Sequence, residues 1–230
     1  MTPEERIIVA LDKGSDRENV AIVQALQGRA RWFKIGMRQY YAGADRVFDA
    51  VREANAKIFL DLKVHDIPAT VAGAMESLAP LAPDLITIHA AGGGAMVRAA
   101  VDMLADRAPQ TRVLAVTILT SMAPEDVHTL SPSEDAEAVV LRLARRAVEH
   151  GAHGIVASPL EAAALRKEIG DALIVTPGVR PAGADLGDQQ RVMTPRRAVD
   201  AGADYLVIGR PIHGAADPRG AFEKILEELR

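Results

Sequence analysis

The sequence predicts one α/β domain, residues 1–230, with the (β/α)8 or TIM-barrel fold. Short apolar segments of strand character alternate eight times with segments of helical character. The strand segments are nearly continuous apolar runs, as expected of parallel strands that are covered on both faces. A chain of 230 residues is long enough for one such barrel, and no linker, low-complexity tract or internal repeat divides it. The alternative is an open doubly wound sheet, but no Gly-x-Gly-x-x-Gly motif follows the first strand.

The first two units occupy residues 6–54. Residues 6–11 form an apolar strand that ends at Asp12, and Ser15 suits the N-cap of a helix running to about residue 27. Residues 31–35 form the second strand, which is apolar except for Lys34, and a helix follows over about 40–54.

The third and fourth units continue the pattern. Residues 57–63 form a strand, and Pro68 can open the helix 68–79 as its first residue. Residues 84–90 form the fourth strand, after which three glycines lead into a helix that ends near residue 105.

The second half repeats the alternation with longer connections. Its strands are expected at 112–119, 154–157, 173–179 and 205–208. Its helices are expected at 133–150, from Pro159, at 195–201 and from about Pro218. The longest stretch without regular structure is 180–193, whose glycines make it a candidate lid over a site.

Composition excludes several classes of protein. Hydrophobic residues make up 49% and charged residues 25%, which is ordinary for a globular domain, and the net charge of −4 gives no basic footprint for nucleic acid. The absence of cysteine excludes disulfides and thiolate metal sites. No signal-like or membrane-length apolar segment is visible, so we expect a cytoplasmic protein with no membrane or nucleic-acid partner.

The stretch 57–70 carries the strongest chemical signal. Phe59, Asp61 and Lys63 alternate with apolar residues, so they share one face of the strand. Asp66 falls beyond the strand, on the loop before Pro68. Because burying a charge costs several kcal/mol unless it is paired, three charges at one strand end indicate a site. A structural ion pair is the alternative for this motif taken alone.

Other strand ends bring polar residues to the same edge of the barrel, where active sites of this fold lie. The polar residues or segments at these ends are Asp12, Lys34, Thr117, Thr120, Ser121, Arg180 and Gly209-Arg210. Alternating charges converging from five strands favour an active site over isolated ion pairs.

The spacing Asp61-x-Lys63-x-x-Asp66 resembles the signature of the orotidine 5'-monophosphate decarboxylase suprafamily, and the continuation 67–70 is similar to its orotidine decarboxylase branch. The segments 116–122, 176–181 and 207–211 resemble further motifs of that branch. The resemblance implies a catalytic set of Lys34, Asp61, Lys63 and Asp66. It implies a substrate-binding set of Asp12, Lys34, Thr70, Thr120, Ser121, Arg180, Gln189, Gly209 and Arg210. His213 departs from the pattern, since a small hydroxyl residue is expected there.

The function that the resemblance implies is conversion of orotidine 5'-monophosphate to uridine 5'-monophosphate and carbon dioxide, in de novo pyrimidine biosynthesis. It implies no metal and no organic cofactor, with Lys63 as the proton donor. It also implies a homodimer whose two active sites are shared, with Asp66 coming from the other subunit. Because no cofactor motif is visible, preorganised charge would have to lower a very high barrier, by roughly 20 kcal/mol or more.

Three competing interpretations remain. The first is a magnesium-dependent decarboxylase or synthase of the same suprafamily, which would carry an acidic residue where this chain has Lys34. The second is a nucleotide-binding regulatory barrel without catalysis, although such a protein has no need of four desolvated network charges. The third is a barrel of unrelated function, which leaves the series from Asp12 to Arg210 unexplained.

Overall fold

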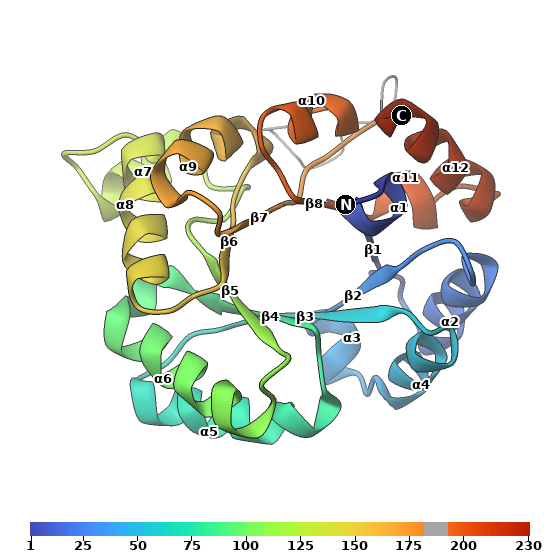
Figure 1. Cartoon of the computed structure of the whole chain (residues 1–230), viewed down its shortest axis with the longest axis horizontal. Helices are drawn as coiled ribbons and strands as arrows, with labels where there is room; N and C mark the ends of the chain where they lie inside the picture. Colours follow the sequence, from blue (N-terminus) through green and yellow to red (C-terminus); the bar gives the residue numbers. More distant parts are fainter. Residues whose placement is uncertain (182–192) are drawn as a thin grey trace.

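The structure is a computed structural model that describes residues 1–181 and 193–230. Eight parallel strands close into a barrel in chain order, with β1 hydrogen-bonded to both β2 and β8 (Figure 1). The strands are β1 (Ile7–Ala10), β2 (Trp32–Gly36), β3 (Lys57–Val64), β4 (Leu85–His89), β5 (Arg112–Val116), β6 (Gly154–Val156), β7 (Leu173–Thr176) and β8 (Tyr205–Ile208). The predicted (β/α)8 barrel is therefore confirmed.

Helices surround the ring of strands (Figure 1). The α-helices are α1 (Pro3–Arg6), α2 (Asp16–Ala25), α3 (Met37–Tyr41), α4 (Asp45–Glu53), α5 (Pro68–Leu78), α6 (Gly93–Arg107), α7 (Pro124–Leu130), α8 (Ala136–Glu149), α9 (Ala162–Ile169), α10 (Pro195–Asp200), α11 (Arg210–His213) and α12 (Pro218–Leu229). Short 3-10 helices are η1 (Ala79–Leu81), η2 (Ala90–Gly92) and η3 (Pro159–Glu161).

Two apolar layers follow from the alternation of side chains along the strands. Residues such as Ile58 and Leu60 face outward and pack in the layer between strands and helices. Phe59 faces inward and belongs to a smaller cluster that fills the barrel. Because inward-facing side chains fill the interior, only the two mouths of the barrel are open to ligands.

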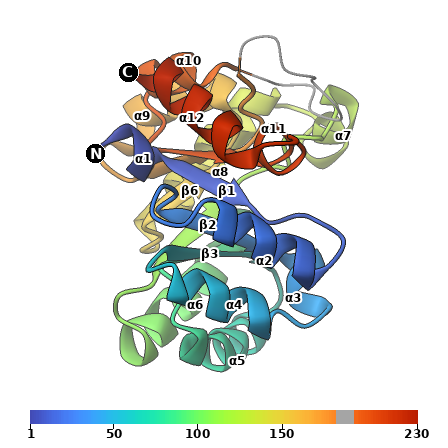
Figure 2. The same ribbon diagram turned by 90° about the vertical axis from the view of Figure 1, so that its right-hand side faces the viewer.

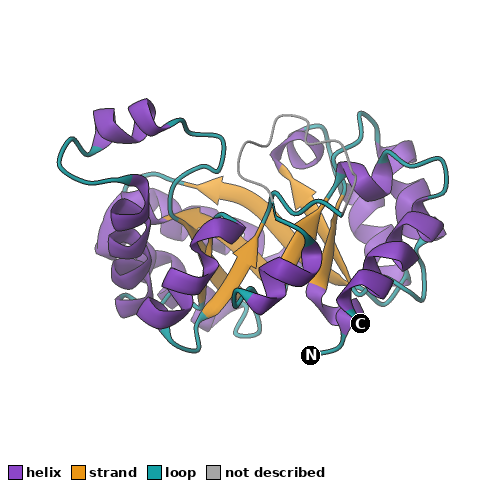
Figure 3. Cartoon of the chain, turned by 90° about the horizontal axis from the view of Figure 1, so that it is seen from above, coloured by secondary structure: helices purple, strands orange, loops and turns teal. Residues whose placement is uncertain are grey.

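The two mouths of the barrel are distinguished by the direction of the strands. All strands run the same way, so their carboxyl ends meet at one mouth, to which the arrowheads in Figure 3 point. Helix α7 projects from the barrel body (Figure 2). The chain termini meet, with Arg230 3.7 Å from Glu4.

Several predicted boundaries are confirmed and several are wrong. Ser15 caps α2, Pro68 opens α5, and β8 spans the predicted residues. The helix predicted over 40–54 is two helices, because the chain turns at Gly43, whose φ of 95° favours glycine. The predicted strands 112–119 and 173–179 end at Val116 and Thr176, and helices α1, α7 and α11 were not predicted.

Candidate active site

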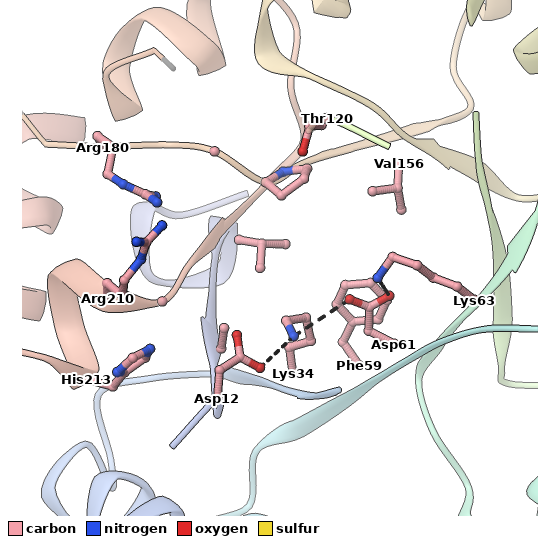
Figure 4. Close-up of a pocket in the computed structure, with 15 residues that line it drawn as sticks. Asp12, Lys34, Phe59, Asp61, Lys63, Thr120, Val156, Arg180, Arg210 and His213 are labelled. Carbon is pink, nitrogen blue, oxygen red and sulfur yellow. Dashed lines mark hydrogen bonds and ion pairs between the residues drawn. The ribbon is translucent and has the colours of Figure 1, made fainter. Parts of the chain in front are cut away.

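A cavity of about 540 Å³ opens at the carboxyl ends of the strands (Figure 4). Seven strands or the loops that follow them contribute to its lining, which explains how residues far apart in sequence meet there. The lining residues are Ala10, Asp12, Lys34, Phe59, Asp61, Lys63, Thr120, Val156, Pro177, Gly178, Arg180, Val207, Gly209, Arg210 and His213.

Four charged side chains form a chain of contacts on one side of this cavity (Figure 4). Asp61 lies between two lysines: its carboxylate is 2.8 Å from Nζ of Lys63 and 3.7 Å from Nζ of Lys34. Lys34 Nζ also donates to Asp12 Oδ1 at 3.1 Å. Asp61 and Lys63, which were predicted to share one strand face, are thus in direct contact.

Burial and neighbouring charges set the protonation of the two innermost groups. Burial by itself lowers the pKa of Lys34, but the nearby Asp61 and Asp12 carboxylates outweigh it and hold that pKa above its ordinary value. Burial by itself raises the pKa of Asp61, but Lys34 and Lys63 outweigh it and hold that pKa below its ordinary value. Both groups are therefore charged at neutral pH, in a setting where water screens them little.

The end of β2 leaves room for this arrangement. A Cβ atom on Gly36 would lie 3.0 Å from Lys34 Nζ and 3.3 Å from Asp12 Oδ1. Such contacts are tighter than a relaxed side chain accepts, so any larger residue would displace the lysine or the carboxylate.

The backbone of Lys63 is in the left-handed region, with φ of 51°. This conformation is uncommon for a residue other than glycine and costs of order 1–3 kcal/mol. It coincides with an irregularity in the pairing of β3 with β4, whose register shifts between Leu60 and Val64. Strain of this kind persists only when surrounding contacts hold it, and it lies at the residue with the strongest chemical prediction.

Thr87 on β4 holds that strained segment, and the sequence reasoning missed it. Its hydroxyl donates to Asp61 Oδ1 at 3.0 Å and accepts the backbone N–H of Lys63 at 2.8 Å. The side chain is fully buried. The only sequence signal for it is a polar residue inside the apolar run Leu85–Ile88.

Two arginines lie at the other side of the cavity (Figure 4). Arg180 follows β7 and is 7% exposed, while Arg210 begins α11 directly after β8 and Gly209. A pair of guanidinium groups suits a phosphate or carboxylate. His213 stands beside them, and burial lowers its pKa.

The remaining predicted site residues divide into three groups. Thr120 lines the cavity. Thr70, Ser121 and Asp66 are exposed and do not line it, so within one chain Asp66 stands apart from Lys63. Gln189 and most of the predicted lid, 180–193, lie outside the described residues.

Two other features are absent from the part of the chain that the structure describes. No group of three or more His, Asp or Glu side chains there is arranged to hold a metal ion. No helix there is long and apolar enough to span a membrane.

Comparison with known proteins gives one consistent result. Residues 5–225 match the family described as "Orotidine 5'-phosphate decarboxylase / HUMPS family". The chain is 49% identical over 226 residues to "Orotidine 5'-phosphate decarboxylase" of Thermobifida fusca (strain YX), covering 97% of this chain and 95% of that one. It is 46% identical over 230 residues to the protein of the same name from Anaeromyxobacter sp. (strain K), covering 100% of both.

A solved structure is similar as well. The crystal structure of orotidine 5'-phosphate decarboxylase from Lactobacillus acidophilus superposes with a TM-score of 0.85 at 36% identity, covering 98% of this chain and 99% of that one.

Proposed function

The chain belongs to the orotidine 5'-phosphate decarboxylase / HUMPS family, and we propose on that premise that it converts orotidine 5'-monophosphate to uridine 5'-monophosphate and carbon dioxide. It is then a carbon–carbon lyase of pyrimidine nucleotide synthesis. The observation that carries the assignment is the charge network at the cavity, in which Asp61 lies between Lys34 and Lys63.

The reaction breaks the bond between the pyrimidine ring and its carboxylate. Carbon dioxide leaves, the electron pair stays on the ring carbon, and that carbon takes a proton from Nζ of Lys63, which later regains one from solvent. Fixed charges in a site of low water content stabilise the developing carbanion without reorganising. Contact of Lys63 Nζ with Asp61 at 2.8 Å supports the role of Lys63 as the proton donor, because it fixes where the ammonium group stands.

Asp61 has the second role at the reacting end. Its pKa is held below the usual range by Lys34 and Lys63 despite burial, so it presents a negative charge. That charge opposes the substrate carboxylate and favours its loss as neutral carbon dioxide.

Arg180 and Arg210 bind the phosphate in this proposal, together with Gly209 and with Gln189 in the segment outside the described residues. Asp12, Thr120, Ser121 and Thr70 would contact the ribose and the base. Contacts to the phosphate raise kcat if they are stronger in the closed complex that reacts than in the initial substrate complex.

The test is an ultraviolet assay of orotidine 5'-monophosphate turnover, with and without a chelator, on the parent and on Lys63→Ala. We expect turnover by the parent that the chelator does not change, and near-complete loss in Lys63→Ala with retained binding of uridine 5'-monophosphate. Turnover within about tenfold of the parent (roughly 1.4 kcal/mol) in the variant would exclude Lys63 as the donor.

A magnesium-dependent reaction on a sugar phosphate is the second candidate, because the family description includes the HUMPS branch. Lys34 argues against it, since a buried ammonium group opposes cation binding at that position. Activity that disappears with chelator and returns with magnesium would favour this candidate.

A homodimer with shared sites completes the proposal. Residues 65–70 are all exposed, and Ile67 is 66% exposed, which is unusual for a large apolar side chain beside an active site. Asp66 lies in this segment and, in a two-fold assembly, each chain would contribute it to the other's cavity.

Mixing two inactive variants tests the shared site. Subunit exchange between Lys63→Ala and Asp66→Asn gives hybrid dimers with one intact site each, so about a quarter of the parental activity should return. No activity after exchange confirmed by mass would place Asp66 in its own chain's site. We also propose a cytoplasmic location, which fractionation of the source cells tests.

A further inference from the structure

A second cavity, of about 330 Å³, lies at the opposite mouth of the barrel, where the strands begin. Its lining is drawn from the first residues of five strands (β2, β3, β4, β5 and β8), from the residues just before β4 and β6, and from the loop that leads into β5. We call it the N-terminal vestibule; its lining residues are Trp32, Lys57, Asp84, Leu85, Pro109, Gln110, Arg112, His153 and Tyr205. The chain termini lie on this side of the molecule (Figure 3). Nothing in the proposed decarboxylation uses it.

Tyr205 is the first indication that this vestibule binds a ligand. It is 8% exposed, and its ring packs edge-on against Trp32 with centroids 5.2 Å apart at 70°. Its hydroxyl makes no hydrogen bond to any residue that the structure describes. The ring is buried, but the hydroxyl oxygen is not among the buried side-chain atoms that lack a partner, so it reaches solvent. Because Tyr205 lines the vestibule, this hydroxyl is available to hydrogen-bond a ligand there.

Two further donors accompany it. His153 Nδ1 accepts the backbone N–H of Val113 at 3.0 Å, so the ring proton is on Nε2. Burial, then the charge of Arg112, lowers the pKa of His153, which keeps the ring neutral as a donor. The Arg112 guanidinium also acts on Tyr205, where it opposes the rise in pKa that burial produces. Arg112 is therefore close to both groups.

The charge balance of the vestibule favours anions. Arg112 and Lys57 have no ion-pair partner within 4.0 Å among the described residues, and Lys57 Nζ lies over the Trp32 ring at 5.0 Å. Among the described residues of the lining, Asp84 is the only carboxylate, and its Oδ2 accepts the backbone N–H of Ile58 at 2.9 Å. Two exposed cations without an ion-pair partner among the described residues thus line a cavity in a protein whose net charge is −4.

We propose that the N-terminal vestibule binds a phosphate group, either inorganic phosphate or a small phosphate ester, through Arg112, Tyr205 and His153. A tetrahedral oxyanion accepts several hydrogen bonds at once. Arg112 and Tyr205 begin β5 and β8, His153 immediately precedes β6, and all three line this one cavity. Arg112 supplies the charge-assisted contact, and the tyrosine hydroxyl and the imidazole N–H supply neutral ones. The volume admits a phosphate group with a few further atoms. This inference does not depend on the proposed decarboxylation.

The chain offers a local reporter for the test. Trp32 is its only tryptophan and lines the vestibule, so its fluorescence responds to this cavity and not to the active site at the other mouth. Phosphate is titrated into the parent at constant ionic strength, with chloride as the reference salt. Ribose 5-phosphate is titrated in parallel, and the tighter of the two identifies the source of the phosphate.

Four variants make the result specific. Arg112→Gln removes the charge and should weaken binding at least tenfold, while Tyr205→Phe removes only the hydroxyl and should weaken it about threefold or more without lowering the melting temperature. Arg98→Gln changes an exposed arginine outside the vestibule, and Arg210→Ala disables the phosphate end of the active site; both should leave the titration unchanged.

Saturable changes that weaken in Arg112→Gln and Tyr205→Phe alone support the proposal. It is overturned if neither phosphate compound gives a saturable change beyond the chloride reference. It is equally overturned if Arg112→Gln titrates like the parent, or if Arg210→Ala abolishes the response.

Discussion

Replacing Asp61 by asparagine removes the one carboxylate that lies between two lysines, and its effect on stability follows from the structure. The Lys34 and Asp61 side chains are 10% and 12% exposed, and their charged atoms are 3.7 Å apart. At that distance their attraction is about 4.5 kcal/mol for an effective dielectric constant of about 20. Removing one partner of a buried pair costs about 3–5 kcal/mol, because the remaining charge stays desolvated.

The lower end of that range applies here. Lys34 keeps Asp12 as a partner at 3.1 Å, and the side chain of Lys63 is 24% exposed, so water solvates part of its charge. We therefore expect Asp61→Asn to lower the free energy of unfolding by about 3 kcal/mol. The double variant Lys34→Met/Asp61→Asn removes both charges. Its loss in free energy of unfolding should be smaller than the sum of the losses in the two single variants, by about 2 kcal/mol.

The assay is urea unfolding followed by circular dichroism at one protein concentration, since assembly makes stability depend on concentration. Asp49→Asn is the matched control. Asp49 pairs with Arg52 at 3.4 Å, but the side chains are 68% and 46% exposed, so the change should cost no more than about 0.5 kcal/mol. The reasoning is refuted if Asp61→Asn costs less than about 1 kcal/mol, or if the two changes add within about 0.5 kcal/mol.

Four further outcomes are expected. Thr87→Val should lower kcat by about ten- to a hundredfold, because it removes a hydrogen bond to the charged Asp61. Thr87→Ser keeps the hydroxyl and should retain most activity. An equal loss in both variants would show that the hydroxyl does not hold Asp61 and Lys63 in place. Gly36→Ala should lower kcat about tenfold by displacing Lys34, with little change in melting temperature; unchanged kinetics would contradict the close contact. Because the pKa of Asp61 is lowered on folding, its contribution to stability is present above about pH 4 and is lost as the pH falls further, through the folded-state pKa. The stability difference between the parent and Asp61→Asn, measured by urea midpoints, should therefore shrink below about pH 4, and a constant difference would exclude this linkage. Arg210→Ala should lower kcat/KM for orotidine 5'-monophosphate by a factor equivalent to several kcal/mol of transition-state binding, and should change kcat/KM for unphosphorylated orotidine little. An equal fold-loss of kcat/KM on both substrates would rule out the phosphate role.

The sequence by itself determined the barrel and much of the candidate site. Periodicity is local, so eight apolar runs were enough to predict eight strands and to place Asp61 and Phe59 on the same face of the third strand. Parallel strands then bring their carboxyl ends to one mouth, and for that reason Asp12, Lys34 and Arg210 could be predicted to converge before any distance was known.

Tertiary structure alone decided the features that depend on pairing between distant segments. The register of β3 against β4 brings Thr87 to Asp61 and leaves Lys63 with a positive φ, and no pattern within either strand encodes that register. The outward position of Asp66 and the unused hydroxyl of Tyr205 are likewise results of three-dimensional placement. Local sequence fixes which face of a strand a side chain occupies, but the partner that it meets there is set by the packing of the whole chain.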